Sequence, residues 1–381
     1  MSDSTDTPPR PIEVLRAMVD ATDRELLGLL ARRTFLVSEI ALAKRERGLK
    51  IRDFARERQI LDDRGQRARG LGLPRDEIES IWRLILRASR EHQAALRAEL
   101  PIETEPRTVA IIGGRGEIGS VMARIFSDLG HYVLVADLET ELSPVDAARM
   151  AEVVLVSVPI VVTERVIREI GPHVRPEGLL MDVTSIKAAP MAAMLESTRA
   201  SVVGTHPMFG PGVHTLQGQR IVVCEGRGDR WASWVRSMVS ARGLVVTDAT
   251  SEQHDRVMAL VQVLTHFQTQ VLGLTLARSS VSLSESLAFT SPAYLMELYV
   301  AARHFAQAAD LYGPIEMLNP RTAEVTEAFS TAAHELREIL VARDQPRFDA
   351  VFEEVRAFFG EFTHEALEQS SYLIDRLVER S

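Results

Sequence analysis

The fold of the central region is decided by residues 108–119, which read TVAIIGGRGEIG. The apolar, β-branched run Thr108–Ile112 predicts a buried strand, and the periodic segment Gly116–Leu129 predicts a helix directly after it. The turn between them holds the pattern GxGxxG, whose glycines are Gly114, Gly116 and Gly119. In a strand–turn–helix unit this pattern is typical of a dinucleotide-binding site. The glycines permit the tight turn, a close backbone approach to a pyrophosphate and close helix–strand packing.

Further cofactor contacts follow from this placement. The helix begins at the turn, so the first N–H groups of the helix, at Glu117 and Ile118, face the phosphates together with the positive end of the helix dipole. Asp137 ends the next predicted strand, 18 residues after Gly119. An acidic side chain there accepts hydrogen bonds from the ribose 2′-hydroxyl and repels a 2′-phosphate, which favours NAD over NADP.

Strand-like and helix-like segments alternate over residues 107–249, which predicts a dinucleotide-binding domain with a parallel sheet and helices on both faces. The expected strands are Thr108–Ile112, Tyr132–Asp137, Val153–Val158, Leu179–Val183, Ser201–Gly204, Arg220–Cys224 and Leu244–Thr247. The expected helices are Gly116–Leu129, Val161–Ile170, Ala188–Ser197 and Arg230–Ala241. Ser157 and Pro159 fall where the third strand ends. Such sheets bind ligands at that edge, so both are candidate cofactor contacts.

Residues 11–98 predict an all-helical domain. Apolar side chains recur at steps of three, four and seven along Ile12–Arg47, and further helices are expected over Phe54–Arg67 and from Asp76 to Ala98. The first helix would be about 54 Å long at 1.5 Å per residue. It is too long to bury its apolar stripe against two shorter helices, so we expect it to pack on a second copy in an intertwined homodimer.

Residues 250–381 predict a second helical region, with apolar spacing of three and four over Val257–Ala277, Ala293–Ala308 and Phe348–Leu377. A linker with two prolines, residues 99–107, separates the first helices from the sheet. The expected architecture is therefore multidomain: an all-α domain over 11–98, a Rossmann-like α/β domain over 107–249 and an all-α domain over 250–381.

Composition argues against several classes of protein. The 381 residues are 46% hydrophobic and 25% charged, as is typical of globular chains. The net charge of −9 argues against nucleic acid as a partner. Cys224 is the one cysteine, so an internal disulfide is impossible and a reducing, cytoplasmic setting is expected. We expect no membrane span, because no apolar run approaches about 20 residues. We expect no metal site, because cysteines and clustered His–carboxylate patterns are missing.

A histidine in the stretch GTHPMFGP is the first candidate for chemistry. This stretch follows a predicted strand and is rich in turn residues, which places His206 at the mouth of the sheet beside a bound nicotinamide. A neutral imidazole there accepts a proton from a substrate hydroxyl as hydride leaves the same carbon. Ser185 follows the preceding strand and is placed to hydrogen-bond the His206 ring. His254 and His266 lie at helical spacing in the C-terminal region, where a structural role is open for either.

Basic residues of the first helix indicate an anion site, with a solvated, salt-bridged surface as the alternative. Arg33 and Lys44 are 11 residues apart, about 1100° of rotation, so they point within ~20° of each other. Their Cα atoms lie about 16 Å apart, a gap that two long side chains close around a small dianion. Arg16 lies about 25 Å from Arg33 and cannot reach that ligand in its own chain. In an antiparallel dimer of long helices, the partner's Arg16 would arrive there.

On these residues and motifs the chain resembles the bifunctional chorismate mutase–prephenate dehydrogenases of tyrosine biosynthesis, over about residues 11–378. The first region is similar to the intertwined, all-helical class of chorismate mutase. The active-site pattern of that class is matched in residue type and spacing by Arg16, Arg33, Lys44, Asp53, Arg56, Glu57, Ser89 and Gln93. The remainder resembles prephenate dehydrogenase through the stretches SVPIVVTE, DVTSIK, GTHPMFGP and SPAYLMELYVAARHFAQ.

The resemblance implies roles for the mutase residues. Arg33 and the partner's Arg16 would hold carboxylates of chorismate, and Lys44 and Gln93 would donate to its ether oxygen. The other four would meet the ring hydroxyl region or complete the pocket: Asp53, Glu57, Arg56 and Ser89. The rearrangement has no proton or covalent step, so catalysis must come from holding a compact conformer and stabilising charge on the breaking ether bond.

For the dehydrogenase, the resemblance implies that His206 accepts the hydrogen bond of the prephenate 4-hydroxyl and that Ser185 orients His206 and the nicotinamide. Arg303 would clamp a prephenate carboxylate, with His266 as a further substrate contact. Hydride passes to NAD, and loss of carbon dioxide aromatises the ring. His206 must be neutral to accept, so activity is expected to fall at acid pH. The resemblance also implies a homodimer through the C-terminal helices and feedback by tyrosine, whose site the sequence does not indicate.

Two alternatives stay open at this point. The same reactions on 4-amino-4-deoxychorismate and 4-amino-4-deoxyprephenate also fit the sequence, because both sets of substrates present the same carboxylates. In the second alternative, the N-terminal helices are only a dimerisation or regulatory module on a prephenate dehydrogenase. Substitution of Lys44 or Gln93 distinguishes this alternative, because a structural module would lose no chemistry.

Overall fold

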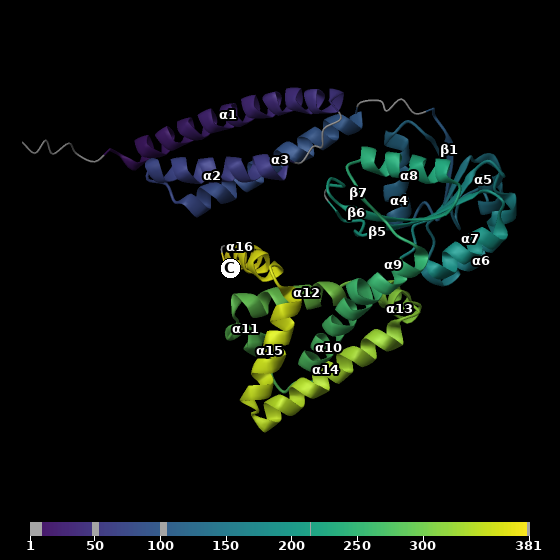
Figure 1. Cartoon of the computed structure of the whole chain (residues 1–381). Coiled ribbons are helices and arrows are strands. Elements are labelled where there is room, and N and C mark those ends of the chain that lie inside the picture. The colour runs from purple at the N-terminus through teal and green to yellow at the C-terminus, as the bar shows by residue number, and fades with distance from the viewer. Residues whose placement is uncertain (1–9, 48–52, 100–104, 214, 379–381) are drawn as a thin grey trace, which may run out of the picture.

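Three regions follow one another along the chain in the computed structural model, which describes residues 10–47, 53–99, 105–213 and 215–378 (Figure 1). Three helices come first, a seven-stranded sheet with its covering helices follows, and further helices form the C-terminal region. This is the predicted architecture: an all-α region, a Rossmann-like α/β region and a second all-α region.

The N-terminal helices lie close to their predicted bounds. They are α1 (Ile12–Glu46), α2 (Phe54–Gly70) and α3 (Arg75–Glu99). Asp53 caps α2 by accepting the backbone N–H of Arg56. α1 packs on α3, yet most apolar side chains of its predicted stripe stay exposed in the single chain, among them Val19 at 59% and Leu26 at 54%. The predicted apolar stripe is therefore present, and one chain buries only Val37 of it.

The central sheet has seven strands in the order β2-β1-β3-β4-β5-β6-β7. They are β1 (Thr108–Ile112), β2 (Tyr132–Ala136), β3 (Val153–Val156), β4 (Leu179–Asp182), β5 (Ser201–Pro207), β6 (Arg220–Arg227) and β7 (Val245–Asp248). The strands β1 to β5 run parallel, so their carboxyl ends meet at one edge of the sheet. That edge carries both the glycine turn after β1 and His206 near the end of β5.

Two details predicted for this sheet are wrong. The sheet is not parallel throughout, because β6 pairs antiparallel with β5, with His206 opposite Val222. This pairing extends β5 to Pro207, so His206 lies within the strand and not in a loop after it. The local turn residues of GTHPMFGP do not show this, because the ladder hydrogen bonds come from β6, a separate segment of the chain.

Helices cover both faces of the sheet. They are α4 (Glu117–Asp128), α5 (Pro144–Met150), α6 (Ile160–Ile170), α7 (Ala188–Ser197) and α8 (Asp229–Ala241). One apolar core lies between the sheet and α5, α6 and α7, and includes Ile167 and Met194. The other lies under α4 and α8, and includes Ile125 and Val235. The short helix α5 was not predicted. Because both faces are covered, this region buries its own core.

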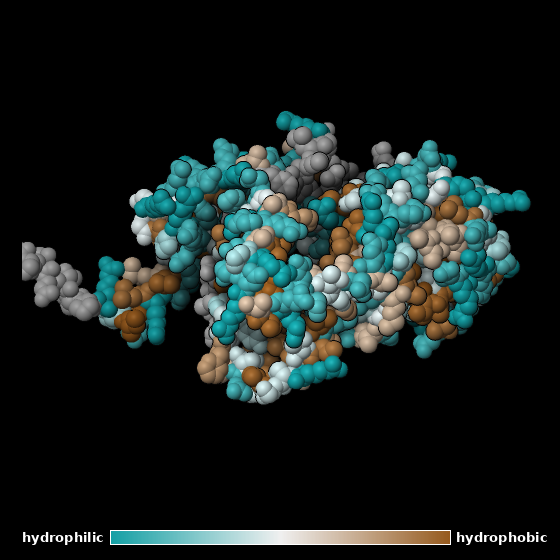
Figure 2. All heavy atoms as spheres, turned by 60° about the horizontal axis from the view of Figure 1, so that its bottom comes forward, coloured by the Kyte–Doolittle hydropathy of each residue, from teal (hydrophilic) through white to brown (hydrophobic). Residues whose placement is uncertain are grey.

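The C-terminal region is helical, as predicted. Its elements are α9 (Ser251–Met258), a π-helical segment (Ala259–Leu264), α10 (Thr265–Ala277), α11 (Leu283–Ala288), α12 (Pro292–Phe305), α13 (Ala309–Met317), α14 (Thr322–Ala342), α15 (Gln345–Phe359) and α16 (Phe362–Val378). Gly360, with a φ of +50°, divides the predicted segment Phe348–Leu377 into two helices. Figure 2 shows hydrophobic side chains exposed among hydrophilic ones on this part of the surface. Phe289 and Phe358 are among the exposed apolar residues.

The expectation about membranes needs one correction. α9, the π segment and α10 form one helix of 27 residues, Ser251–Ala277, which is long and apolar enough to cross a membrane by length and composition. The same helix carries His254 and Asp255, whose side chains are buried against the sheet region. Its composition is therefore only weak support for a span, and its contacts are those of a helix within a folded protein.

Candidate active sites

The turn after β1 has the shape of a dinucleotide cradle. Gly113 has a φ of +82° and donates its N–H to the end of β2 at 2.8 Å. A Cβ on Gly119 would lie 2.3 Å from the carbonyl oxygen of Gly113, so only glycine lets α4 pack this closely. Gly116 gives α4 no side-chain cap, which leaves the first N–H groups, at Glu117 and Ile118, for a phosphate. The turn therefore fits the pyrophosphate of a dinucleotide.

Asp137 follows β2 and faces the same turn. Its carboxylate accepts the backbone N–H of Arg115 at 2.9 Å and of Leu138 at 2.8 Å. Gly114 packs against β2, where a Cβ would lie 2.9 Å from a methyl group of Val135. The structure thus brings Asp137 and the glycine turn together, with the carboxylate half-buried at the rim.

Ser157 and Pro159 lie after β3, on the other side of the glycine turn. The carbonyl oxygen of Ser157 is so near that a Cβ on Gly113 would approach it to 2.2 Å. Pro159 precedes the first residue of α6, so it has a structural role in starting that helix. Both residues therefore lie at the carboxyl edge of the sheet with the turn.

His206 is buried in β5 and is held by a second histidine. Its Nδ1 lies 2.8 Å from Nε2 of His254, and Nδ1 of His254 lies 2.8 Å from Oδ1 of Asp255. Although His206 is only 3% exposed, its Nε2 is not enclosed and makes no hydrogen bond to the described residues. Burial lowers the pKa of His206 well below its usual value, and His254 and Lys187 lower it further. The neutral imidazole is therefore the form present at pH 7.

A buried ion pair lies beside His206. Lys187 Nζ donates to Asp182 Oδ2 at 2.5 Å and to the carbonyl oxygen of Thr205 at 2.8 Å, and both charged side chains are 0% exposed. Gly204 leaves room for Met191 and Lys187, because a Cβ there would lie 2.6 Å from Met191 Sδ and 3.2 Å from Lys187 Cδ. Desolvating two charges is offset only by close pairing and further hydrogen bonds. The pair therefore ties the end of β4 to the backbone of β5 directly before His206.

The predicted hydrogen bond between Ser185 and His206 is not present among the described residues. Nδ1 of the ring is bonded to His254, for which the sequence left a structural role open. Ser185 lies after β4, is half-buried, and has no hydrogen-bond partner in the described part of the chain. The ring is therefore oriented by His254 here, and a role for Ser185 toward the nicotinamide stays a prediction.

His266 belongs to a second polar group, formed by α10, α12 and α13. Its Nδ1 lies 3.6 Å from Glu316 Oε1, and its ring meets Tyr312 edge-on. Burial lowers the pKa of His266 to about 4, with a smaller effect of His304. Arg303 is exposed on α12 and forms no ion pair with a described residue. Its guanidinium is therefore open to a carboxylate.

The π-helical segment determines where His266 points. In an uninterrupted α-helix, residues 12 positions apart, such as His254 and His266, differ by about 120° around the axis. A π-bulge accommodates one additional residue, so the separation counts as 11 α-helical positions and the two directions agree within about 20°. His266 therefore lies on the same helix face as His254, about 16 Å further along.

The mutase pattern is partly assembled within one chain. Arg33 on α1 donates a hydrogen bond to the hydroxyl of Ser89 on α3. Gln93, four residues after Ser89, is buried with its Oε1 enclosed and unpartnered, while its amide nitrogen is not enclosed. Glu57 on α2 pairs with Arg90 on α3 at 2.6 Å. Side-chain contacts therefore join α1 to α3 and α2 to α3, and the amide nitrogen of Gln93 is not enclosed.

The remaining residues of the pattern lie along α1 or at the start of α2. Arg16 is exposed on α1, 17 residues before Arg33, and has no partner among the described residues. Asp53 caps α2, and Arg56 donates to Gln59 at 2.6 Å on the exposed side of that helix. Lys44 is half-buried near the end of α1. A single chain therefore does not bring Arg16 to the site.

Sequence reasoning did not single out several residues that contact the candidate sites in both regions. Arg90 directly follows Ser89, and Lys187 ends the DVTSIK stretch, yet their partners lie in other elements. Asp255 directly follows His254, and its link to His206 spans about 50 positions of sequence. Each of these residues lies next to a residue, or within a stretch, already singled out from the sequence, and that position is the signal that could have identified it. Among the described residues, no group of His, Cys, Asp and Glu side chains could hold a metal ion.

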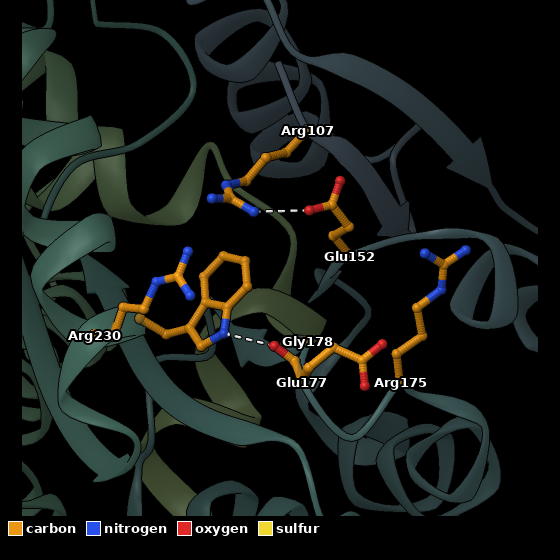
Figure 3. Close-up of a pocket in the computed structure, with 7 residues that line it drawn as sticks. Arg107, Glu152, Arg175, Glu177, Gly178 and Arg230 are labelled. Atoms are coloured by element: carbon orange, nitrogen blue, oxygen red, sulfur yellow. Dashed lines mark hydrogen bonds and ion pairs between the residues drawn. The ribbon is translucent and has the colours of Figure 1, made fainter. Parts of the chain in front are cut away.

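A pocket of about 250 Å³ lies at the other edge of the sheet, near the amino ends of β1, β3 and β4 (Figure 3). Arg107 pairs there with Glu152 at 2.7 Å and lies 4.9 Å from the ring centre of Trp231. Trp231 donates its ring N–H to the carbonyl oxygen of Glu177. Open α/β sheets bind ligands at their carboxyl ends, so this pocket is separate from the dehydrogenase site.

Comparison with known protein families divides the chain into three parts. Residues 15–94 match the family described as chorismate mutase type II. Residues 132–263 match the nucleotide-binding domain of prephenate dehydrogenase, and residues 250–354 match its dimerization domain. The predicted nicotinamide-dependent dehydrogenase is thereby confirmed, and the reading of the N-terminal helices as a structural module is not favoured.

Two curated relatives match along nearly their whole length. The T-protein of Haemophilus influenzae is 33% identical over 364 residues, which cover 95% of this chain and 96% of that protein. The T-protein of Enterobacter agglomerans is 34% identical over 366 residues, which cover 95% and 97%. The 4-amino-4-deoxyprephenate dehydrogenase of Streptomyces pristinaespiralis is 28% identical and matches 57% of this chain, so the amino-substrate alternative is not favoured.

Solved structures share the fold of the last two regions. Prephenate dehydrogenase from Aquifex aeolicus, in complex with hydroxyphenyl propionate and NAD+, has a TM-score of 0.55 at 17% identity and covers 67% of this chain and 98% of that one. Arogenate dehydrogenase from Synechocystis has a TM-score of 0.54 at 15% identity and covers 66% and 98%. With the full-length relatives, these findings mean that the chain belongs to the T-protein family of bifunctional chorismate mutase–prephenate dehydrogenases.

Proposed function

We propose that this chain rearranges chorismate to prephenate and then oxidatively decarboxylates prephenate to 4-hydroxyphenylpyruvate with NAD. The observation that carries the proposal is His206, a neutral, buried imidazole with one open nitrogen. It lies at the carboxyl edge of the sheet, which also carries the glycine turn. A base at that edge faces the nicotinamide end of a bound dinucleotide.

In the mutase domain, fixed hydrogen-bond donors supply the catalysis. The rearrangement needs a compact substrate conformer and stabilisation of negative charge on the ether oxygen. Arg33, oriented by Ser89, binds a carboxylate, and Lys44 and Gln93 donate to the ether oxygen. The enclosed Oε1 of Gln93 supports this role, because it leaves the amide N–H groups to face the substrate. Glu57 meets the ring hydroxyl, and Asp53 and Arg56 close the pocket once substrate is bound.

A second copy of the chain completes this site. The apolar residues Leu26, Leu29 and Leu30 of α1 are 40–62% exposed in the single chain. Antiparallel packing of two α1 helices would bury this stripe and bring the partner's Arg16 to the substrate carboxylate. The match of residues 250–354 to a dimerization domain also supports a homodimer, here through the C-terminal region.

In the dehydrogenase domain, His206 accepts the proton of the prephenate 4-hydroxyl while hydride leaves the same carbon. NAD, when bound in the glycine cradle, accepts that hydride. Arg303 holds a substrate carboxylate through its open guanidinium, with His266 as a further contact. Ser185 orients the nicotinamide. Release of carbon dioxide then restores the aromatic ring.

Asp137 determines the choice of dinucleotide. Its carboxylate stands half-buried beside the turn, with both oxygens accepting backbone N–H groups. It can accept hydrogen bonds from a ribose 2′-hydroxyl and would repel a 2′-phosphate. NAD is therefore preferred over NADP.

The cellular setting follows from general properties. Burial raises the pKa of the Cys224 thiol to about 12, so the one cysteine is unreactive and suits the reducing cytoplasm. The net charge of −9 disfavours nucleic acid as a partner, and no membrane partner is proposed. We also propose tyrosine as an effector, on the family resemblance alone and without an assigned site.

The test is one reaction with purified protein, chorismate and NAD, in which chorismate, prephenate, 4-hydroxyphenylpyruvate and NADH are followed together. NADH rising with 4-hydroxyphenylpyruvate is the expected result. Prephenate accumulating without NADH would overturn the NAD-dependent step and direct attention to NADP. Chorismate left unchanged would overturn the mutase assignment.

A further inference from the structure

We propose that Asp255 and His254 are positioning residues that fix the tautomer of His206, so that Nε2 of His206 is the atom that accepts the substrate proton. This inference rests on the proposed role of His206 as the base of the dehydrogenase. It assigns the chemistry to one of the two ring nitrogens and explains why three buried polar side chains are linked in a row.

The chain of hydrogen bonds begins at the carboxylate of Asp255. Oδ1 accepts the backbone N–H of Lys187 at 2.8 Å, and Oδ2 accepts the backbone N–H of Ala188 at 2.9 Å. Burial opposes ionisation, but hydrogen bonds from His254, Ala188 and Lys187 outweigh it and keep the pKa of Asp255 below its usual value. Asp255 is therefore ionised at neutral pH, and an ionised carboxylate can only accept hydrogen bonds.

His254 transmits this polarity. Its Nδ1 lies 2.8 Å from Oδ1 of Asp255, so Nδ1 must carry the proton and donate. In a neutral imidazole the other nitrogen is then an acceptor, which makes Nε2 of His254 an acceptor toward its neighbour. That neighbour is Nδ1 of His206, at 2.8 Å.

The tautomer of His206 follows from this contact. Nδ1 of His206 must donate to His254, so its proton resides there and Nε2 carries the free lone pair. Nε2 has no hydrogen-bond partner among the described residues and is not enclosed. Lys187, the nearest buried cation, is bound to Asp182 and Thr205 and does not occupy this position.

The same arrangement serves the reaction step. The substrate O–H bond breaks, an Nε2–H bond forms on His206, and the carbon gives up its hydride to the cofactor. The imidazolium that results lies two hydrogen bonds from the Asp255 carboxylate, whose negative charge stabilises it. No oxidant beyond the nicotinamide is required.

The other tautomer of His206 would stop the reaction. If His254 donated from Nε2, His206 would carry its proton on Nε2 and could not accept another. Asp255→Asn permits this state, because an amide nitrogen at the Oδ1 position gives up the hydrogen bond from the Lys187 N–H, donates to Nδ1 of His254 and reverses both histidines. His254→Gln is the conservative variant, because a side-chain carbonyl oxygen can still accept from Nδ1 of His206.

The first measurement is the ¹⁵N spectrum of the full chain labelled at histidine, with His206 assigned by comparison with His206→Asn. We expect the Nδ1–H tautomer of His206 in the wild type and the Nε2–H tautomer in Asp255→Asn. An Nε2–H tautomer in the wild type would overturn the inference. The spectrum needs no turnover, so it is independent of whether prephenate is the substrate.

Kinetics on prephenate and NAD supply the second measurement. Asp255→Asn should lower the dehydrogenase kcat on the order of 100-fold, with KM for prephenate nearly unchanged. The single variant His254→Gln should retain a large part of the wild-type kcat, whereas His254→Leu should not. Glu252→Gln, an exposed residue on the same helix, is the matched control and should retain wild-type kcat.

Two results separate the possible failures. Mutase activity and thermal unfolding report whether each variant is folded, and a folded Asp255→Asn with wild-type kcat would overturn the inference. A wild-type chain that leaves prephenate unoxidised with NAD would instead overturn the proposed dehydrogenase reaction, with the tautomer still measured by ¹⁵N.

Discussion

His206 is 3% exposed and is hydrogen-bonded to His254 of its own chain, whereas Arg16 on α1 is exposed and meets no described residue. Both are predicted to serve an active site of the same protein. On our proposal, the dehydrogenase base is oriented within one chain, whereas the mutase site lacks one of its arginines until a second copy binds. The difference reflects how each region buries its apolar surface.

The central sheet is covered on both faces by its own helices, which bury Ile111, Leu155 and Leu180 completely. A strand inside such a sheet has a rigid position, so a side chain near its end is held accurately. α1 has no such cover, and Val19 and Leu26 of its apolar stripe remain more than 50% exposed. In the proposed dimer, burying that stripe against the second copy supplies free energy that the single chain does not gain.

The largest expected effect tests the independence of the two sites. His206→Asn should lower the dehydrogenase kcat by about 10²- to 10⁴-fold, because it removes the proton acceptor. The mutase activity of the same preparation should stay at the wild-type level and serves as the internal control. Dehydrogenase turnover at the wild-type rate would place the base on another residue.

The dependence of the mutase on a second copy is tested by mixing variants. Arg16→Ala and Lys44→Gln should each lower mutase kcat about 100-fold, because each removes a charged donor from the site. If Arg16 acts in the partner's site, refolding the two variants together restores about a quarter of the wild-type sites, because half of the dimers are mixed and each contains one intact site. Mixtures no more active than the separate variants would show that Arg16 acts within its own chain.

The pH profile distinguishes a buried from an exposed base. Because burial lowers the pKa of His206, the neutral form persists as the pH falls through 6.5, the ordinary value. We expect kcat/KM for prephenate to stay level through that pH and to fall about tenfold per unit only at lower pH. An acid limb centred at or above 6.5 would show that His206 is not buried as described.

The smallest expected effect concerns the dinucleotide. Asp137→Asn should shift the ratio of kcat/KM for NAD over NADP about tenfold toward NADP, since a hydrogen bond to a charged group contributes about 1.5–3 kcal/mol. Glu139→Gln removes a neighbouring exposed charge and is the matched control. Equal shifts in both variants would assign the effect to net charge and not to a contact with the ribose.

Much of the architecture could be predicted from short stretches of sequence. The strand β1, the glycine turn and α4 follow from local periodicity and turn chemistry, and α1 follows from an uninterrupted helical pattern. The extension of β5 to Pro207 could not be predicted, because β6 supplies the pairing. The short helix α5 and the π-helical segment were also missed, since neither has a distinct local pattern.

In the candidate sites, too, some residues could be identified from the sequence, whereas their partners across a helix interface could not. Helix spacing singled out Arg33, the family resemblance added Ser89 and Gln93, and the structure joins Arg33 to Ser89. The pairing of Glu57 with Arg90 depends on how α2 packs against α3. Helix spacing fixes which residues share a face, but the neighbour across an interface is set by packing.

The sequence by itself determined the three-part organisation, the dinucleotide turn and the identity of His206 as the candidate base. These depend on contacts between residues close in the chain, where backbone geometry leaves few choices. Only the tertiary structure decided that His254 and Asp255, and not Ser185, hold the ring of His206. That choice depends on the packing of α9 against β5 and α7, which brings together side chains about 50 to 70 positions apart.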